Sequence, residues 1–302
     1  MTASPAEATI IDGREIAQRL KWAIQKELQR LRLKPNEGPQ LRVLYFDTPA
    51  SKVYWKAQDF EACSLGIRTS QERPASGVWT SSSYMCPWDA PQALVEEIIQ
   101  HWNYDSAVHG IFVHQPMPLQ VDPQRVSALI DPRKDVEGIH PQNSARRFFA
   151  KARIGSCTAL AVMELIESTG MSLEGKDAVV VGHSEIVGRP VSMLLLDKLA
   201  TTTICHVATH ELHKHVERAD VLVVAVGKPQ FIKGAWIKPG AIVIDVGINV
   251  VNGRVVGDVE FEAAKERAAF ISPVPGGVGP VTVMMVMKNT VEAFKLQHGN
   301  TQ

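Results

Sequence analysis

Hydrophobic positions along the chain follow two alternating patterns, one typical of helices and one typical of buried strands. Helical spacing of apolar residues is clear over residues 16–31, 53–66 and 90–102. Short apolar runs at residues 41–46 and 107–114 indicate buried strands. Strands that alternate with helices in this way favour an α/β domain whose parallel sheet is covered on both faces.

The second half repeats this alternation with stronger signals. Residues 177–182 form a buried apolar run that ends in glycine, and residues 186–200 follow with helical periodicity. Three more strand-like runs come next, at residues 201–207, 220–227 and 241–247. We therefore predict a Rossmann-type domain with a doubly wound parallel sheet, followed by a final helix over residues 281–297.

One segment departs from the alternation. Residues 72–91 are rich in serine and proline, yet they include Trp79, Tyr84 and Trp88. We predict a long surface loop whose aromatic side chains pack on the domain; a lid over a neighbouring cleft is the alternative.

Composition narrows the class of protein. The chain has 302 residues, which suggests two domains or one large one. Its 32 basic residues balance its 32 acidic residues, so charge gives no reason to expect a nucleic acid or a membrane as partner. The first 20 residues lack the pattern of a secretory signal. Four widely spaced cysteines without a CxxC motif are typical of reduced thiols, and we expect a cytoplasmic protein.

Glycine-rich turns follow three of the predicted strands. The run VVVGHSEIVGRP places Gly182 at a strand end and Gly188 and Pro190 at a helix start, where backbone N–H groups can hold a diphosphate. The runs VAVGKP and IDVGIN place Gly227 and Gly247 at the same edge of the sheet. The spacing is not GxGxxG, so a glycine turn in an ordinary βα unit is the alternative.

Basic and histidine side chains near these turns favour NADP over NAD. No acidic residue ends the second strand to bind the ribose hydroxyls, whereas His183, Arg189, His206 and His210 lie nearby. A histidine cluster is a possible metal site, since His206, His210, His213 and His215 are close in sequence. These four fall across a strand end and a helix start, and Glu211 is the one carboxylate at ligand spacing. We therefore predict no metal site.

These motifs resemble the methylenetetrahydrofolate dehydrogenase/methenyltetrahydrofolate cyclohydrolase family. From Ile11 to Phe294 the resemblance rests on DTPAS with Tyr54, GIFVHQPMP, KDVEGIHP, VVVGHSEIVGRP, VAVGKPQFI, GAIVIDVGIN and ISPVPGGVGPVT. It implies a homodimer with a folate cleft between two domains. The implied folate-binding catalytic domain comprises residues 1–148 plus 279–302, since the C-terminal helix returns to it, and the implied Rossmann-type NAD(P)-binding domain comprises residues 149–278.

The resemblance also implies the site residues. The catalytic candidates are Tyr54, Gln58 and His114. The candidates for binding the folate substrate are Tyr54, Gln115, Asp135, Glu137, Pro273, Pro275, Gly276 and Gly277. The candidates for binding NADP or NAD are Gly182, His183, Ser184, Ile186, Val187, Gly188, Arg189, Pro190, Val207, Val226, Gly227, Gly247, Ile248 and Thr282.

The chain departs from the family pattern on the folate side. Gln58 stands where the family has a lysine, His114 where it has a glutamine, and Gln115 where it has a leucine. Glu137 replaces an aspartate, and residues 156–159 read SCTA in place of PCTP. Random drift explains these changes poorly, because the nucleotide motifs are nearly intact.

The two reactions of the family make different demands. Hydride transfer from the one-carbon bridge to the nicotinamide needs mainly alignment of two ring systems, to which Tyr54 can contribute. Hydrolysis of the methenyl group needs protons to move, and the amide of Gln58 does not titrate usefully. We therefore predict an NAD(P)-dependent methylenetetrahydrofolate dehydrogenase with weak or absent cyclohydrolase activity.

Three alternatives stay open. If Gln58 and His114 face each other, His114 can replace the lysine as the base, and the enzyme is then bifunctional. The chain can also be a repurposed paralogue that binds a folate but turns over another compound or acts as a sensor. A dehydrogenase for an unrelated small molecule is the third alternative. The sequence does not decide the physiological direction.

Overall fold

The computed structural model describes residues 7–32, 37–68, 83–149 and 153–299, without the side chains of residues 49–54. The chain forms two compact units, each an α/β domain, which confirms the predicted fold class. The first, here the six-stranded unit, comprises Met1–Arg19 and Thr158–Thr282. The second, the three-stranded unit, comprises Leu20–Cys157 and Val283–Gln302.

The six-stranded unit contains a sheet of order β1-β11-β8-β7-β5-β6 in which every pair is parallel. Its strands are β1 (Thr9–Ile10), β5 (Asp177–Val181), β6 (Thr201–Cys205), β7 (Val221–Val224), β8 (Ile242–Asp245) and β11 (Phe270–Ile271). The central strands are almost continuously apolar because both of their faces are buried. The chain passes from β5 outward to β6 and then returns to β7 on the other side of β5. Ligands of doubly wound sheets bind at the carboxyl edge beside such a reversal.

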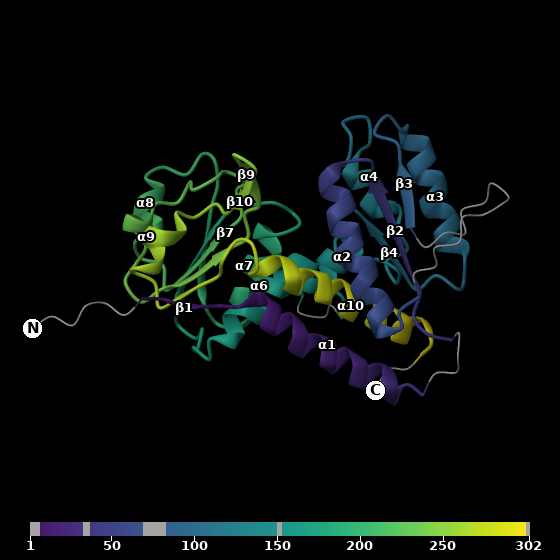
Figure 1. Ribbon diagram of the computed structural model, residues 1–302, viewed down its shortest axis with the longest axis horizontal. Helices are drawn as coiled ribbons and strands as arrows, with labels where there is room; N and C mark the ends of the chain where they lie inside the picture. The colour runs from purple at the N-terminus through teal and green to yellow at the C-terminus, as the bar shows by residue number, and fades with distance from the viewer. Residues whose placement is uncertain (1–6, 33–36, 69–82, 150–152, 300–302) are drawn as a thin grey trace, which may run out of the picture. The chain divides into compact units, whose positions relative to one another are not determined.

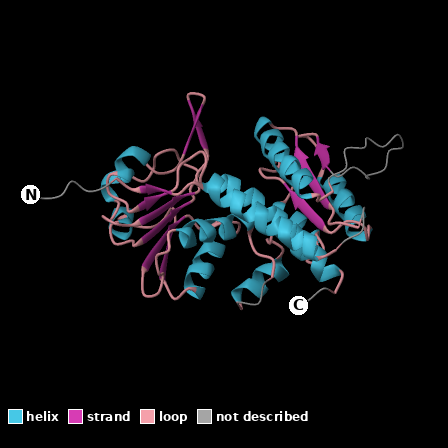
Figure 2. Cartoon of the chain, turned by 60° about the horizontal axis from the view of Figure 1, so that its bottom comes forward, coloured by secondary structure: helices cyan, strands magenta, loops and turns pink. Residues whose placement is uncertain are grey.

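Helices cover the sheet of this unit, as Figure 2 shows with helices in cyan and strands in magenta. They are α6 (Cys157–Ser168), α7 (Gly188–Asp197), α8 (Leu212–Val216), the 3₁₀ helix η1 (Gly234–Trp236) and α9 (Phe261–Lys265). Alternate strand residues such as Leu222 and Val243 share one core with Val216 of α8 and Ala264 of α9. An antiparallel hairpin, β9 (Asn249–Val251) and β10 (Arg254–Val256), projects from this unit.

The N-terminal strand belongs to the six-stranded unit, which differs from the expected assignment of residues 1–148 to one domain. Thr9 and Ile10 pair with Phe270 and Ile271 of β11. The first turn of α1 (Gly13–Arg30) also packs there, because the N–H of Gly13 donates to the carbonyl of Gly276 at 2.9 Å. These contacts join residues at opposite ends of the chain, so no local pattern predicts them.

The three-stranded unit has a parallel sheet of order β3-β2-β4. Its strands are β2 (Leu41–Phe46), β3 (Ser83–Cys86) and β4 (Gly110–Val113). Its helices include α2 (Pro49–Leu65), α3 (Gln92–Tyr104), α4 (Pro123–Leu129), α5 (Pro141–Phe148) and most of α10 (Val278–Gln297). Figure 1 shows α2 and α3 on opposite sides of this sheet.

The serine- and proline-rich segment contains a strand, so the prediction of a loop throughout residues 72–91 was wrong for residues 83–86. Tyr84 packs against the core of the three-stranded unit. The ring of Trp88 lies edge-on to Phe46, with 6.3 Å between ring centroids. Trp79 lies outside the described residues.

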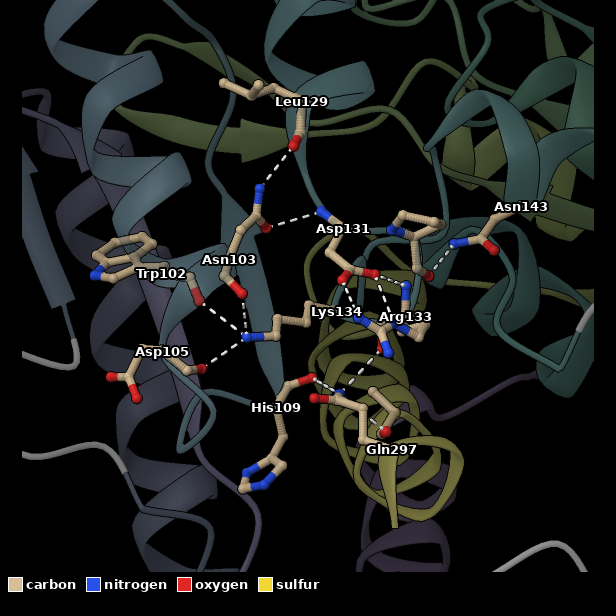
Figure 3. A network of polar contacts seen from close by, with 12 residues as sticks. Trp102, Asn103, Asp105, His109, Leu129, Asp131, Arg133, Lys134, Asn143 and Gln297 are labelled. Carbon is tan, nitrogen blue, oxygen red and sulfur yellow. Dashed lines mark hydrogen bonds and ion pairs between the residues drawn. The ribbon is translucent and has the colours of Figure 1, made fainter. Parts of the chain in front are cut away.

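A buried lysine, Lys134, fixes the start of the KDVEGIHP segment (Figure 3). Lys134 is 4% exposed, and its ammonium group donates to the carbonyls of Trp102, Asn103 and Asp105 at 3.0, 2.8 and 2.7 Å. These carbonyls end α3, where a helix leaves its last acceptors unpaired. Desolvation lowers the pKa of Lys134, but three acceptors and the charge of Asp131 favour its ammonium form.

Among the described helices, none has both the length and the apolar composition that crossing a bilayer demands.

Replacing Lys134 by methionine should destabilise the protein by roughly 2–4 kcal/mol, because buried carbonyls lose charge-assisted hydrogen bonds. Urea unfolding followed by circular dichroism measures this. Lys198→Met is the matched control, since Lys198 makes an exposed ion pair with Glu167 at 2.7 Å. Equal losses in the two variants would contradict the assigned role of Lys134.

Candidate functional site

The turn between β5 and α7 brings the backbone at Gly182 and Gly188 into close contact. Gly182 has a φ of 124°, and a Cβ atom on it would overlap the carbonyl oxygen of Ala225. A Cβ atom on Gly188 would overlap the carbonyl oxygen of Gly182. Glycine is therefore required at both positions, and α7 can begin directly after β5.

This turn presents unpaired donors at the start of a helix. In the part of the chain that the structure describes, the backbone N–H groups of His183, Ser184 and Glu185 have no hydrogen-bond partner. The hydroxyl of Ser184 accepts from the N–H groups of Val187 and Gly188 at 3.1 and 3.4 Å. Free N–H groups at a helix start attract anions. The residues present therefore fit the diphosphate of a dinucleotide.

Other nucleotide-binding candidates lie after β6, after β8 or near the start of α10. The rings of His183 and His206 lie edge-on, with 5.6 Å between centroids. Val207 and Ile248 are 93% and 62% exposed. Thr282 is buried, and its hydroxyl donates to the carbonyl of Val278 at 3.0 Å. The β5–α7 turn and the first turn of α7 also contain Ile186, Val187, Arg189 and Pro190.

The turns after β7 and β8 are occupied by two buried carboxylates that sequence reasoning missed. Asp258 accepts from the N–H groups of Val226 and Gly227, and Asp245 accepts from that of Gly247. Burial raises the pKa of Asp245 to about 6 against the opposing effect of its hydrogen bonds, and the charge of Asp258 adds to the rise. Because these N–H groups already have acceptors, they are not available to a diphosphate.

The proline-glycine loop lies in the six-stranded unit. Gly276 has a φ of 108°. A Cβ atom on Gly277 would come within 2.6 Å of the carbonyl oxygen of Pro273. Pro275 is exposed. The glycines thus allow a compact loop in front of α10.

The other folate candidates lie in the three-stranded unit, where the structure brings Gln58 and His114 together. Nε2 of His114 lies 2.8 Å from Oε1 of Gln58, and the two side chains are 3% and 1% exposed. Tyr45 and Phe112 place their rings edge-on to the imidazole, at 6.3 and 5.0 Å between centroids. The condition for the bifunctional alternative, that the two side chains face each other, is met.

Burial sets the charge state of this pair. Desolvation lowers the pKa of His114 to about 4, so the imidazole is neutral at physiological pH. In the tautomer that matches the contact, the Nε2–H group donates to the amide oxygen of Gln58. The amide nitrogen of Gln58 is buried and has no hydrogen-bond partner among the described residues. This orphaned donor is available to a ligand.

Asp135 holds the loop that presents Glu137. Asp135 is fully buried, and its oxygens accept from the N–H groups of Gly138 and His140 at 2.9 and 2.8 Å. The same carboxylate accepts from the side-chain amide of Asn143 at 2.9 Å. With these bonds, Asp135 orders the loop, whereas Glu137 remains partly exposed. Burial of the carboxyl and the charge of Asp135 raise the pKa of Glu137 to about 8.

Asn289 of α10 is a further residue that the sequence did not single out. Its side-chain amide donates to the carbonyls of Val136 and Gly155 at 2.8 and 2.9 Å. It also contacts the buried thiol of Cys157 at 3.3 Å. Two of the segments in which this chain departs from the family pattern, those around Glu137 and residues 156–159, are thus tied to one helix.

One predicted residue remains apart from these clusters, and the side chain of another is not described. Gln115 is exposed at the residue after His114. Tyr54 lies in α2, but its side chain is outside the described residues, and its role stays a prediction. No group of three histidine, cysteine, aspartate or glutamate residues in the described ranges is arranged to hold a metal ion.

Comparisons with known proteins agree on one family. The sequence model for the tetrahydrofolate dehydrogenase/cyclohydrolase catalytic domain matches residues 11–137, and the model for its NAD(P)-binding domain matches residues 156–298. Bifunctional protein FolD 2 of Myxococcus xanthus is 45% identical over 95% of this chain and 96% of its own length. Bifunctional protein FolD of Acetivibrio thermocellus is 43% identical over 96% and 98%.

Solved structures extend this similarity. The methylenetetrahydrofolate dehydrogenase-cyclohydrolase of Trypanosoma brucei, crystallised with NADP cofactor and an inhibitor, has a TM-score of 0.88 and 36% identity, over 96% of this chain and 98% of that one. The bifunctional enzyme of Campylobacter jejuni has a TM-score of 0.87 and 35% identity, over 96% and 99%.

The depressed pKa of His114 should make stability fall in acid. The unfolded chain binds its proton near pH 6.5 and the folded chain near pH 4, so the free energy of unfolding drops between these values as the pH falls. At about pH 5 this one group should cost about 2 kcal/mol relative to neutral pH. Burial also lowers the pKa of His109 to about 4, whereas it raises the pKa of Asp245 to about 6 and that of Glu137 to about 8. The two carboxyls oppose the two histidines over this pH range, so the contribution of His114 is measured as a difference between proteins.

Urea unfolding at neutral and acid pH tests this, with His114→Gln as the variant. The variant should lack the part of the wild-type pH dependence that His114 contributes, about 2 kcal/mol between pH 7 and pH 5, because His109, Asp245 and Glu137 titrate in both proteins. His210→Gln, at an exposed position, should retain all of it. A wild-type dependence in His114→Gln would show that the imidazole titrates normally.

Proposed function

Because the chain belongs to the tetrahydrofolate dehydrogenase/cyclohydrolase family, we propose that it oxidises 5,10-methylenetetrahydrofolate to 5,10-methenyltetrahydrofolate with NADP and then hydrolyses that product. The observation that carries the second activity is the 2.8 Å contact between His114 and Gln58. Curated relatives at 45% and 43% identity are named bifunctional. These findings favour the bifunctional alternative over weak or absent cyclohydrolase activity.

The β5–α7 turn is the proposed site for the cofactor diphosphate. Its three unpaired N–H groups and the helix start offer positive potential without a charged side chain. When bound, NADP supplies the nicotinamide that accepts the hydride. His183 and His206 favour NADP over NAD. The end of β6 is where an NAD-binding sheet usually has an acid for the ribose hydroxyls, and this chain has His206 there with His183 beside it.

The first step asks the protein mainly for positioning. Folate nitrogens donate electrons as the hydride leaves, so no side chain has to remove a proton from the one-carbon bridge. Glu137 is the proposed partner of the polar pterin edge, since its loop is held by Asp135 and the residue stands where the family has an aspartate. Tyr54 is the proposed contact to the face of the ring system.

The second step needs proton transfer. Water adds to the methenyl carbon and gives up a proton, and a carbon–nitrogen bond then breaks to leave a formyl group, with one proton released overall. His114 is the candidate acceptor of that proton, since burial keeps its imidazole neutral at physiological pH. The same low pKa makes it a weak base, which limits the rate that it can support. Gln58 fixes one ring nitrogen and keeps its own amide nitrogen free to hold a substrate oxygen or nitrogen.

A dehydrogenase with little cyclohydrolase activity is the second candidate function. The near-complete burial of Gln58 and His114 favours it, since a catalytic base must reach the attacking water. The homodimer, the cytoplasmic location and the domain boundaries at residues 148 and 278 stay predictions.

Separate recording of reduced cofactor and methenyl-folate tests the proposal. Wild-type enzyme should reduce NADP while methenyl-folate stays below the level that uncatalysed decay allows. His114→Ala should lose on the order of 100-fold in the hydrolysis of added methenyl-folate. Its dehydrogenase rate should change by less than about threefold, since that step uses no base.

The double variant Gln58→Lys/His114→Gln is the matched control, because it installs the residues that the family has at these positions. It should keep both activities. Equal accumulation of reduced cofactor and methenyl-folate by the wild type would establish the dehydrogenase-only candidate instead.

The raised pKa of Glu137 predicts a pH-dependent KM for folate. The carboxyl is largely protonated at neutral pH and becomes a full acceptor for pterin N–H groups as the pH passes 8. The KM of the wild type should therefore fall by up to about tenfold between pH 7 and 9. Glu137→Gln should show a flat KM, measured in initial-rate assays, whereas a parallel fall in both proteins would exclude Glu137 as its cause.

A further inference from the structure

The carboxylate of Asp258 accepts hydrogen bonds from three successive backbone N–H groups. Its Oδ2 atom accepts from the N–H groups of Val226 at 2.7 Å and Gly227 at 2.9 Å, and its Oδ1 atom accepts from Lys228 at 2.8 Å. The side-chain amide of Asn249 donates to Oδ1 at 2.8 Å. Asp258 has no solvent exposure, so this turn is held from inside the protein.

A second buried carboxylate holds the first. Oδ1 of Asp245, at the end of β8, accepts from the N–H of Asp258 at 3.0 Å and from that of Gly247 at 2.9 Å. Its Oδ2 atom accepts from the N–H of Val259 at 2.8 Å. Asp245 is 3% exposed. The chain of contacts runs from β8 through Asp258 to the turn after β7.

Glycines make this arrangement sterically possible. A Cβ atom on Gly247 would overlap the carboxylate of Asp258, and a Cβ atom on Gly257 would overlap that of Asp245. The two turns and the two carboxylates are therefore packed as one body. A shift of either carboxylate has to move the backbone at Gly227 or Gly247.

We propose that Asp258 and Asp245 are positioning residues of the cofactor site, which fix the turns after β7 and β8 so that NADP binds with its diphosphate at the β5–α7 turn alone. This inference rests on the proposed function. It assigns a role in nucleotide binding to two side chains that are themselves buried.

The physical reason is competition for an anion site. Three successive N–H groups directed at one point form a nest that attracts a phosphate as readily as a carboxylate. Asp258 occupies that nest at 226–228, whereas the N–H groups of His183, Ser184 and Glu185 have no partner among the described residues. The carboxylate of Asp258 thereby prevents the diphosphate from binding at residues 226–228, and it fixes the conformation of this turn.

Asp258→Asn is the direct test. Asparagine keeps the shape but replaces one acceptor oxygen by a donor nitrogen, which then faces backbone N–H groups. We expect the Kd for NADP, measured by calorimetry on the full chain, and the KM for NADP to rise roughly tenfold or more. The KM for folate should change by less than about twofold, because the folate candidate Glu137 is held by a separate carboxylate.

Asp220→Asn is the matched control. Asp220 also accepts from a strand N–H, that of Asp177 at 3.0 Å, and pairs with Lys238 at 2.7 Å, but it lies at the amino edge of the same sheet. It should lower the thermal unfolding temperature without changing the Kd for NADP. If both variants lose stability and neither changes the Kd, Asp258 is only a structural residue and the proposal is wrong.

A milder variant covers the case in which Asp258→Asn does not fold. Asn249→Ala removes one of the four donors to the same carboxylate and should raise the Kd for NADP at least about twofold. An unchanged Kd in folded Asn249→Ala would then overturn the inference. Wild-type protein that binds neither NADP nor NAD refutes the proposed function and this inference with it, whereas tight wild-type binding with no effect of the variants refutes the inference alone.

Discussion

Turns that follow the strands of a parallel sheet leave backbone N–H groups without ladder partners, and in a packed protein these groups need acceptors. Both units of this protein supply buried aspartates. Asp135, which forms a β-bridge with Ile111 of β4, binds the loop that follows it. Asp258 binds the turn after β7, and Asp245 binds the turn after β8. Since ligands of such sheets bind at this edge, the same hydrogen bonds shape the candidate site.

Hydrogen bonding and burial also give neighbouring polar groups different roles and charge states. Because Asp135 uses its oxygens inside the loop, Glu137 is the carboxyl of this segment that these hydrogen bonds leave unused. Its raised pKa and the lowered pKa of His114 arise from the same cause, the loss of water around a group that would otherwise be charged. Near neutral pH the three-stranded unit therefore contains a mainly uncharged carboxyl at Glu137 and an uncharged imidazole at His114.

Periodicity predicted the long helices and the central strands well, since β7 is apolar throughout, β5 and β8 are apolar apart from one terminal aspartate each, and α10 is long. It missed β1 and β11, because two-residue strands carry no period, and β3, because its neighbours are rich in serine and proline. The Gln58–His114 contact could be stated only as a condition, since 56 residues separate the partners. Asp245 and Asp258 are ordinary acids in sequence, and their roles exist only through hydrogen bonds made in three dimensions.

The pairing of Thr9 with Phe270 has a consequence for how the protein is made. A ribosome synthesises β1 first and its neighbour β11 near the end, so the six-stranded sheet cannot be completed until almost the whole chain has emerged. The three-stranded unit is also incomplete during that interval, because its last part, Val283–Gln302, is synthesised after β11. A gene fragment for residues 158–282 alone would leave the edge of β11 unpaired, and exposed parallel edges invite association with other chains. The order of synthesis and the order of assembly are therefore different in this fold.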